Sequence, residues 1–538
     1  MKKLLFVLLC LALCALCASA CAGEGTFGNF KYYFSSDGTA WITDYTGSDT
    51  EVVFPEEING YKVICLRTEG SKNGTVRKVT IPASVETFHT NNPFAGFEAL
   101  EEIAVTADNL AYVVVDGVLF EKAKKALVSY PRAKEGETYE IREGIAAVGQ
   151  EAFTDNRFLK KIVIPGTVTD MGQLAFNHCA ALMEVDIADG ATQIGYMAFR
   201  MCSSLQKVSL PDSITKISDS AFFDCDALTE ITIPGSVKTV DTYAFSCCDG
   251  LKTVTIGEGV TSIGDNAFRS CRGLTSAPLP NSVTQLGIGA FANCESLTEI
   301  TIPDGVRSLG TGVYAGCDKL RTIRVSDTHP TLSVRDGVLF DKAGTTLISY
   351  PSARRGVAYE IPEGVTRIED LAFAKSSLSR ITIPDTVLEI GEGAFYENRM
   401  LFRIVIPDSV TSIGADAFRY CLKMESLTLP ANLALIDEFT FFQCESLKKV
   451  EIPESVTTIG SQAFACCHAL KEITLPASVS EIHKLAFDRC EKLANVIVIR
   501  DSYAESFCGE MKLPMTVLDP QPAEEPAQTE DPYSWLND

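Results

Sequence analysis

Cysteines are the residues of this 538-residue chain whose types and spacing most suggest chemistry. Neighbouring thiols on adjacent strands, about 4.8 Å apart, could form disulfides or hold a metal ion. Ser376 and Asn398 stand at the equivalent position of two repeats, and a disulfide or metal scheme tolerates such exchanges poorly. We therefore expect buried, reduced thiols that fill small slots and hydrogen-bond to the next turn. Eleven cysteines form this ladder, each three residues after a recurring Phe or Tyr: Cys179, Cys202, Cys225, Cys248, Cys271, Cys294, Cys317, Cys421, Cys444, Cys467 and Cys490.

Groups for acid–base, nucleophilic or cofactor chemistry do not converge in the sequence. The five histidines are scattered, and neither a Gly-x-Ser-x-Gly nor a His-Glu-x-x-His motif occurs. Gly23, Gly25 and Gly28 match a phosphate-binding glycine motif, but no strand–helix pattern surrounds them, so a flexible tether is the favoured interpretation. The sequence therefore predicts a protein that is not an enzyme, with no catalytic, cofactor-binding or metal-binding residues.

The aromatic residue before each ladder cysteine marks a sequence repeat. A typical unit reads Leu-x-x-Ile-x-Ile-Pro, then Val-x-x-Ile-Gly, then Ala-Phe-x-x-Cys. This pattern indicates a short strand ended by Pro, a second short apolar segment, and a return made of a turn or one helical turn. One unit cannot bury its apolar face, but stacked units can. The markers predict an α/β solenoid of about fifteen ~23-residue repeats: Phe94, Phe153, Phe176, Phe199, Phe222, Phe245, Phe268, Phe291, Tyr314, Phe373, Phe395, Phe418, Phe441, Phe464 and Phe487.

Two insertions, at about 106–141 and 326–361, interrupt the period. Both contain Asp-Gly-Val-Leu-Phe and Ser-Tyr-Pro, offset by 220 residues, so we infer that a block of about 220 residues was duplicated. Each insertion is expected to form a β-hairpin with a charged turn near 121–125 or 341–344. The hairpins could be two equivalent protruding binding sites, ~40 Å apart along the solenoid axis, or clips that pack on it.

The leader resembles a secretory signal: Lys2 and Lys3 precede an apolar run, and Ala18-Ser19-Ala20 precedes Cys21. Cys21 is a candidate lipidation site, and ordinary cleavage after Ala20 is the alternative. The expected organisation is a signal peptide, a tether with a β-hairpin cap, the repeat solenoid, a C-terminal cap containing a short helix at 502–511, and an acidic, Pro-rich, disordered tail. These parts span 1–20, 21–74, 75–500, 501–518 and 519–538.

The net charge and the side chains expected on the surface limit the classes of partner that the protein is expected to bind. The net charge of −23 disfavours nucleic acid and anionic lipid, so membrane contact is expected only through a lipid anchor. On the strand face, Lys161, Glu184 and Lys207 alternate and should form cross-strand ion pairs. Residues just after the markers offer better anchors for a ligand, because aromatic and Arg side chains dominate binding energy. The candidate binding residues are Arg200, Phe223, Tyr396, Arg419, Tyr420 and Phe442.

The Leu/Ile spacing, the Ile-Pro turn and the Ala-Phe-x-x-Cys return resemble the BspA-like family of bacterial leucine-rich repeat surface proteins, over roughly residues 75–500. The resemblance implies a surface solenoid, often linked to adhesion, with no shared catalytic residues. We expect an exported, lipid-anchored, monomeric recognition or adhesion protein that binds a host or microbial protein or glycan. The alternative is a structural envelope scaffold or spacer that holds a partner protein.

Anchoring is the first testable prediction. If Cys21 is acylated, the native protein should partition with detergent, and Cys21→Ser should release it or stall its processing, because two or three acyl chains give stable attachment. Mass spectrometry of the mature N-terminus measures the modification. A soluble mature protein that begins at Cys21 without lipid mass would contradict the prediction.

Overall fold

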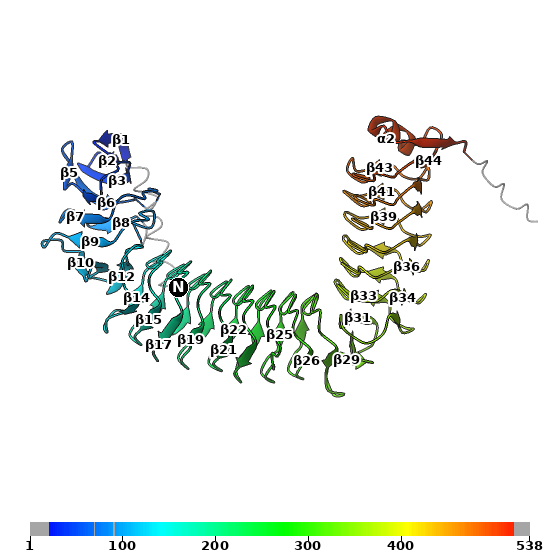
Figure 1. Ribbon diagram of the computed structural model, residues 1–538, viewed down its shortest axis with the longest axis horizontal. Coiled ribbons are helices and arrows are strands. Elements are labelled where there is room, and N and C mark those ends of the chain that lie inside the picture. The colour runs from blue at the N-terminus through cyan, green and yellow to red at the C-terminus, as the bar shows by residue number, and fades with distance from the viewer. Residues whose placement is uncertain (1–20, 69, 90–91, 521–538) are drawn as a thin grey trace, which may run out of the picture. The chain divides into compact units, whose positions relative to one another are not determined.

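The computed structural model describes residues 21–68, 70–89 and 92–520. The chain divides between Thr331 and Leu332 into two compact units. Each unit is a stack of turns built from short parallel strands (Figure 1), and the whole β-solenoid has about 21 turns of ~23 residues. The signal peptide expected over 1–20 lies outside the described residues, as does the expected acidic tail apart from Asp519 and Pro520.

The described returns are turns without a helix, so the turn is confirmed of the two alternatives expected for them, and the expected α/β class is wrong for the solenoid. Within the described residues, the only α-helix is α2 (Tyr503–Met511) of the C-terminal cap. In a typical return, the residue before Ala-Phe and the residue before the ladder position both have a left-handed backbone; Met197 and Met201, with φ of 52° and 59°, are one such pair. Because an isolated left-handed residue cannot continue a right-handed helix, the segment forms successive tight turns instead.

The count of fifteen repeats is also too low. Tyr130 and Tyr350, which belong to the insertions, stack on Phe153 and Phe373 with ring centroids 4.8 and 5.2 Å apart. The insertions therefore complete further turns, in which Tyr replaces the marker Phe.

The first unit contains two rows of parallel strands along its length, and each row divides into separate sheets. The longer strands form four sheets: β4(Glu51–Val53), β7(Lys78–Ile81) and β9(Glu102–Val105); β13(Thr138–Glu140), β15(Lys161–Ile164), β17(Glu184–Ile187) and β19(Lys207–Ser209); β21(Glu230–Ile233) and β23(Thr253–Ile256); and β26(Glu299–Thr301) and β28(Thr322–Arg324). The two-residue strands belong to two sheets, one that includes β14(Ala147–Val148) and β16(Asp170–Met171), and one formed by β18(Gln193–Ile194), β20(Lys216–Ile217), β22(Thr239–Val240), β24(Ser262–Ile263), β25(Gln285–Leu286) and β27(Ser308–Leu309).

The second unit repeats this arrangement, with two sheets in each row, and Figure 1 shows the two rows on opposite sides of the stack. The longer strands are β32(Ala358–Glu360), β34(Arg380–Thr382), β36(Arg403–Val405), β38(Ser426–Thr428), β40(Lys449–Glu451), β42(Glu472–Thr474), β44(Asn495–Ile499) and β45(Met515–Leu518). The two-residue strands are β33(Arg367–Ile368), β35(Glu389–Ile390), β37(Ser412–Ile413), β39(Leu435–Ile436), β41(Thr458–Ile459) and β43(Glu481–Ile482).

Each insertion contains the expected hairpin and one further strand that was not expected. In the first, β10(Tyr112–Val115), β11(Val118–Glu121) and β12(Ala126–Ser129) pair antiparallel in order, and β12 then pairs parallel with β14. The second repeats this with β29(Leu332–Arg335), β30(Val338–Asp341) and β31(Thr346–Ser349). The turn between β10 and β11 is Asp116-Gly117, where both residues have positive φ, 53° and 76°.

A sheet at the N-terminus caps the first unit, and a helix at the C-terminus caps the second unit. The N-terminal sheet contains β1(Cys21–Phe27), β2(Phe30–Ser35), β3(Thr39–Tyr45), β5(Glu57–Ile58), β6(Tyr61–Leu66) and β8(Thr87–Phe88). The β-hairpin expected in the N-terminal cap is present, with Asp37-Gly38 in the turn that joins β2 to β3. The predicted helix at 502–511 is confirmed: Ser502 caps α2 by accepting a hydrogen bond from the Glu505 N–H at 3.2 Å. The parallel ladder already begins at β4, within the residues expected to form the cap.

Stacked aromatic rings run through the interior of both units. From Phe176 to Phe291, successive marker rings lie 5.0–5.3 Å apart and within 6° of parallel. All of these rings are fully buried. Burying a Phe contributes about 2–3 kcal/mol, so this aromatic column supplies apolar burial that a single turn cannot achieve.

The left-handed returns generate the second prediction. Gln462 has a φ of 54° and is half-buried, so Gln462→Gly should raise the free energy of unfolding by about 1 kcal/mol, because glycine removes the Cβ clash of the left-handed region. Denaturant titration measures this change. Gln462→Ala is the matched control, since it removes the same side chain but keeps Cβ. Equal stabilities of the two variants would contradict the interpretation of the returns.

Candidate functional site

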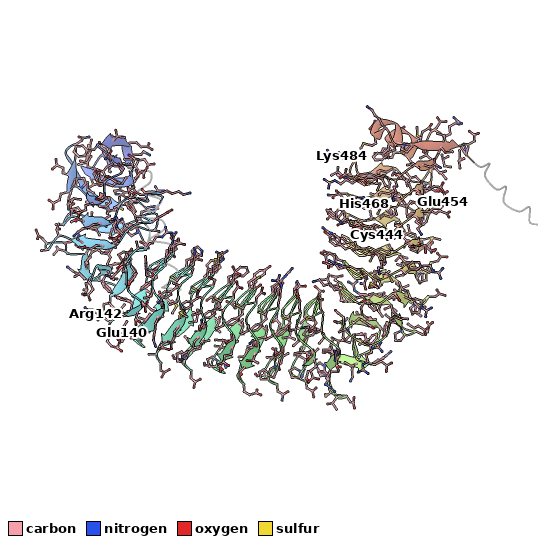
Figure 2. All side chains as sticks on the ribbon, in the orientation of Figure 1. Glu140, Arg142, Cys444, Glu454, His468 and Lys484 are labelled. Carbon is pink, nitrogen blue, oxygen red and sulfur yellow. The ribbon has the colours of Figure 1, made fainter. Side chains whose placement is uncertain are left out.

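The cysteine ladder lies inside the stack and makes a repeated contact. Every ladder Sγ lies 3.0–3.4 Å from the carbonyl oxygen of the marker aromatic in the preceding turn, as Cys225 does with Phe199. The weak hydrogen bond therefore runs to the preceding turn, not to the next turn as expected. Ten of the eleven thiols are buried and Cys490 is half-buried. Figure 2 shows Cys444 within the stack, with Glu454 and Lys484 on opposite sides.

Other residues in the ladder slot also donate hydrogen bonds, and Asn398 uses the same kind of acceptor as the thiols. Asn398 Nδ2 donates to the Phe373 carbonyl at 2.7 Å, and Ser376 donates to Asn398 Oδ1. Asn156, which the sequence analysis missed, occupies the slot after Phe153 and donates to carbonyl oxygens of the preceding turn at 3.2 and 3.3 Å. The slot therefore selects a small hydrogen-bond donor, and the exchange of Cys for Asn is explained by the donor that both supply.

Electrostatics make the ladder thiols unreactive. Burial raises the pKa of Cys202 and of Cys490 to about 12, and the thiolate is the reactive form. Within the described part of the chain, no three His, Cys, Asp or Glu residues are placed to hold a metal ion.

Four of the six candidate binding residues come together in the second unit. Tyr396, Arg419, Tyr420 and Phe442 lie on successive returns, and Phe439, which the sequence analysis missed, completes the group. We call these five residues the aromatic–arginine patch. All five are half-buried. Adjacent rings meet edge to face, with centroids 5.7 Å apart for Tyr396–Tyr420 and for Tyr420–Phe442.

Arg419 holds the patch together. Its guanidinium carbon lies 4.9–5.0 Å from the centroids of Tyr420, Phe439 and Phe442, a cation–π geometry. It also pairs with Asp416 at 2.8 Å, while its buried Nε has no hydrogen-bond partner in the described structure. With the cation fixed from several sides, the rings are held in one arrangement before any ligand binds.

Carboxylates surround the patch. Burial, and then the charges of Asp370, Asp416, Asp437 and Glu438, raise the pKa of Glu392. Burial and the adjacent Glu397 likewise raise the pKa of Tyr396. Rigid aromatic faces with an acidic rim suit a polar or cationic surface on a macromolecule.

Arg200 and Phe223 form the corresponding contact in the first unit, with the Arg200 guanidinium 5.5 Å from the ring centroid. The positions equivalent to Tyr420 and Phe439 are Met201 and Ser220. The first unit therefore retains the Arg–Phe contact without the surrounding aromatic rings, so the six candidates form two groups of unequal size.

The insertions are packed into the core more than expected of protruding sites. In the first, Leu119, Phe120 and Leu127 are buried, and in the second Phe340 and Tyr350 are buried. Deleting an insertion would therefore remove core side chains as well as any binding surface. The exposed tip at Asp116 pairs with Arg142 at 2.9 Å and borders a hollow of about 790 Å³ beside β9. Binding at the insertions stays a prediction.

The strand face contains the cross-strand ion pairs that the sequence predicts. Glu184 lies 3.4 Å from Lys161 and 3.0 Å from Lys207, its register neighbours on β15 and β19. These exposed pairs contribute little stability each. They do establish the ordinary pattern of this surface, in which opposite charges alternate from rung to rung.

Comparison with known proteins identifies the repeat. A family model described as "BspA type Leucine rich repeat region" matches in six copies, over residues 133–252, 215–335 and 366–494. The chain belongs to the BspA-type leucine-rich repeat family. This confirms the resemblance inferred from the Leu/Ile spacing and the Ala-Phe-x-x-Cys return.

Solved structures that are similar to this chain cover most of its length. A leucine-rich cell surface protein of Faecalibacterium prausnitzii is 27% identical, with 91% of this chain and 97% of that chain covered and a TM-score of 0.49. A leucine-rich repeat protein of Bacteroides ovatus is 20% identical (92% and 99% covered, TM-score 0.40), and the pneumococcal vaccine antigen PcpA is 18% identical (93% and 100%, 0.41). A search of curated proteins finds no match. In the described residues, no helix combines the length and apolarity that a membrane span requires.

The ladder generates the third prediction. With iodoacetamide at pH 8, the ladder thiols of the folded protein should stay unlabelled, because their raised pKa leaves little thiolate; half-buried Cys247 and Cys466 should react first. Mass spectrometry of tryptic peptides measures the labelling. After denaturation without reductant, all eleven ladder thiols should be labelled. Disulfides between neighbouring rungs would contradict the ladder of reduced thiols.

Proposed function

We propose that this protein is a non-enzymatic, cell-surface recognition protein that binds a host or microbial macromolecule through the aromatic–arginine patch. Membership of the BspA-type family supports a non-enzymatic surface protein. The single observation that carries the proposal is the enclosure of Arg419 by three aromatic rings on neighbouring returns of the second unit.

The physical argument rests on what dominates binding energy. Interface hot spots are enriched in Tyr, Trp and Arg, and rigid aromatic anchors lose little conformational entropy on binding. The patch presents Tyr396 and Tyr420 on a backbone fixed by stacked turns, and the cation–π contacts hold the rings in place. A stacked solenoid also offers successive turns to one extended partner surface. Export and a lipid anchor at Cys21 belong to the same proposal, since both place the patch outside the cell.

The alternative function is a structural envelope scaffold. The binding experiment described next distinguishes a scaffold from a recognition protein. A recognition protein should bind a specific external ligand through the patch, whereas a scaffold should bind only components of its own envelope.

The fourth prediction tests the patch. The mature protein, immobilised in reducing buffer, is exposed to a panel of matrix proteins, glycans and envelope extract. For the ligand that binds, the double variant Tyr396→Ser, Tyr420→Ser should lose at least about tenfold in affinity, because two hot-spot rings are removed. Phe158→Ser is the matched control, since Phe158 is an exposed aromatic of the first unit, 41% exposed. Thermal unfolding of each variant verifies that the fold persists. Unchanged affinity of the folded double variant would contradict the assignment to the patch.

A further inference from the structure

Arg380 and Arg403 form an exception to the charge pattern of the strand face. They are register partners at the first position of β34 and β36. The equivalent pairs of charged residues have opposite signs elsewhere, as in Lys161–Glu184 and Lys449–Glu472. Among the described residues, Arg380–Arg403 is the one pair of like charges at this position in the longer strands.

Neither guanidinium is neutralised. Both side chains are exposed, and within the described structure neither has a carboxylate partner. Like charges directly opposite each other on neighbouring strands are destabilising. The chain has 70 acidic and 47 basic residues, so carboxylates are abundant, yet in the part of the chain that the structure describes none forms an ion pair with either arginine. The arrangement has an electrostatic cost that an anionic group bound between the two side chains would remove.

The strands open next to this pair and leave a hollow. Only Arg380 and Arg403 are in register between β34 and β36, whereas β36 and β38 are in register at three positions. The hollow has a volume of about 490 Å³ and includes the outward-facing Thr382, Val405 and Thr428. Val405 is 57% exposed, so the hollow combines two cations with an exposed apolar side chain.

Neighbouring residues limit the charge that the site can accept. The register neighbours of the pair are Ala358 on one side and Ser426 on the other, both uncharged. At the far end of the hollow lie Asp385 and Asp408, which would repel a second anionic group there. A polyanion therefore fits poorly, and a single anionic group on a neutral or apolar body fits well.

We infer that Arg380 and Arg403 form a binding site for one carboxylate of a partner polypeptide. Both guanidinium groups bind this carboxylate, while Val405 contacts an apolar side chain of the partner next to it. Guanidinium groups bind carboxylates through paired, charge-assisted hydrogen bonds. Arg beside exposed apolar surface is the composition of protein interfaces, and no aromatic ring lines the hollow to pack on the face of a sugar.

This site is independent of the aromatic–arginine patch. Arg380 and Arg403 lie on the longer strands, whereas Tyr396, Arg419 and Phe442 lie on the returns. Variants at one site leave the other intact, so failure of either proposal can be recognised separately.

The fifth prediction uses two fluorescent, capped pentapeptides as probes, Thr-Val-Glu-Val-Thr and the same peptide with Gln in place of Glu. Fluorescence anisotropy measures their binding to the mature protein at low salt. The Glu peptide should bind at least about tenfold more tightly than the Gln peptide. Arg380→Gln and Arg403→Gln should each remove most of this preference. Arg157→Gln is the matched control, because Arg157 is an exposed arginine of the first unit, and it should leave binding unchanged.

A second readout follows stability. Arg403→Glu turns the like pair into an ion pair with Arg380, so it should raise the melting temperature while abolishing binding of the Glu peptide; Arg157→Glu should do neither. Equal binding of the two peptides, or full binding by Arg380→Gln, would overturn the site. Tighter binding of a uronate trisaccharide than of the Glu peptide, lost in the same variants, would overturn the assignment to a polypeptide.

Discussion

Stacking of each turn on its neighbours is the interaction on which the rest of this structure depends. A single turn of about 23 residues has too little interior to bury its Phe ring, but two neighbouring turns sandwich it. The marker rings lie about 5 Å apart in both units, and the ladder thiol of each turn reaches the backbone of the preceding one. The aromatic column and the cysteine ladder therefore both fix how each turn aligns with its neighbours.

The alignment of the turns in the interior determines which surface residues of neighbouring turns lie beside each other. Because the period is fixed, residues at similar positions of the repeat lie beside each other on neighbouring returns. Tyr396 therefore contacts Tyr420, and Arg419 contacts Phe442, although about 23 residues separate the members of each pair. The same rule places Arg380 beside Arg403 on the strand face. Recognition in such a fold needs no loop of its own, since a few substitutions at repeated positions create a charged or aromatic surface on a rigid support.

Much of the fold could be predicted from the sequence, because the apolar positions of the repeat are the buried positions of the structure. The strands, the Asp37-Gly38 hairpin, the helix capped by Ser502 and the small ladder slot all follow from local patterns. The left-handed returns did not, because residues such as Met197 carry no preference for that conformation and the stack imposes it. Phe439 was missed because it lies just before the marker pair and joins the patch only through the neighbouring turn. The Arg380–Arg403 pair becomes visible only when strand register is known.

The central claim is that the stacked rings hold the surface side chains in place. Hydrogen exchange of the Phe418→Ala variant tests it most directly, because Phe418 packs between Phe395 and Phe441 beneath the aromatic–arginine patch. The account predicts a marked loss of amide protection in the turns that carry Tyr396, Arg419 and Phe442, with protection around Phe199 in the first unit unchanged. Unaltered protection of the patch turns would contradict it, since the stacked rings would then not be what positions the aromatic–arginine patch.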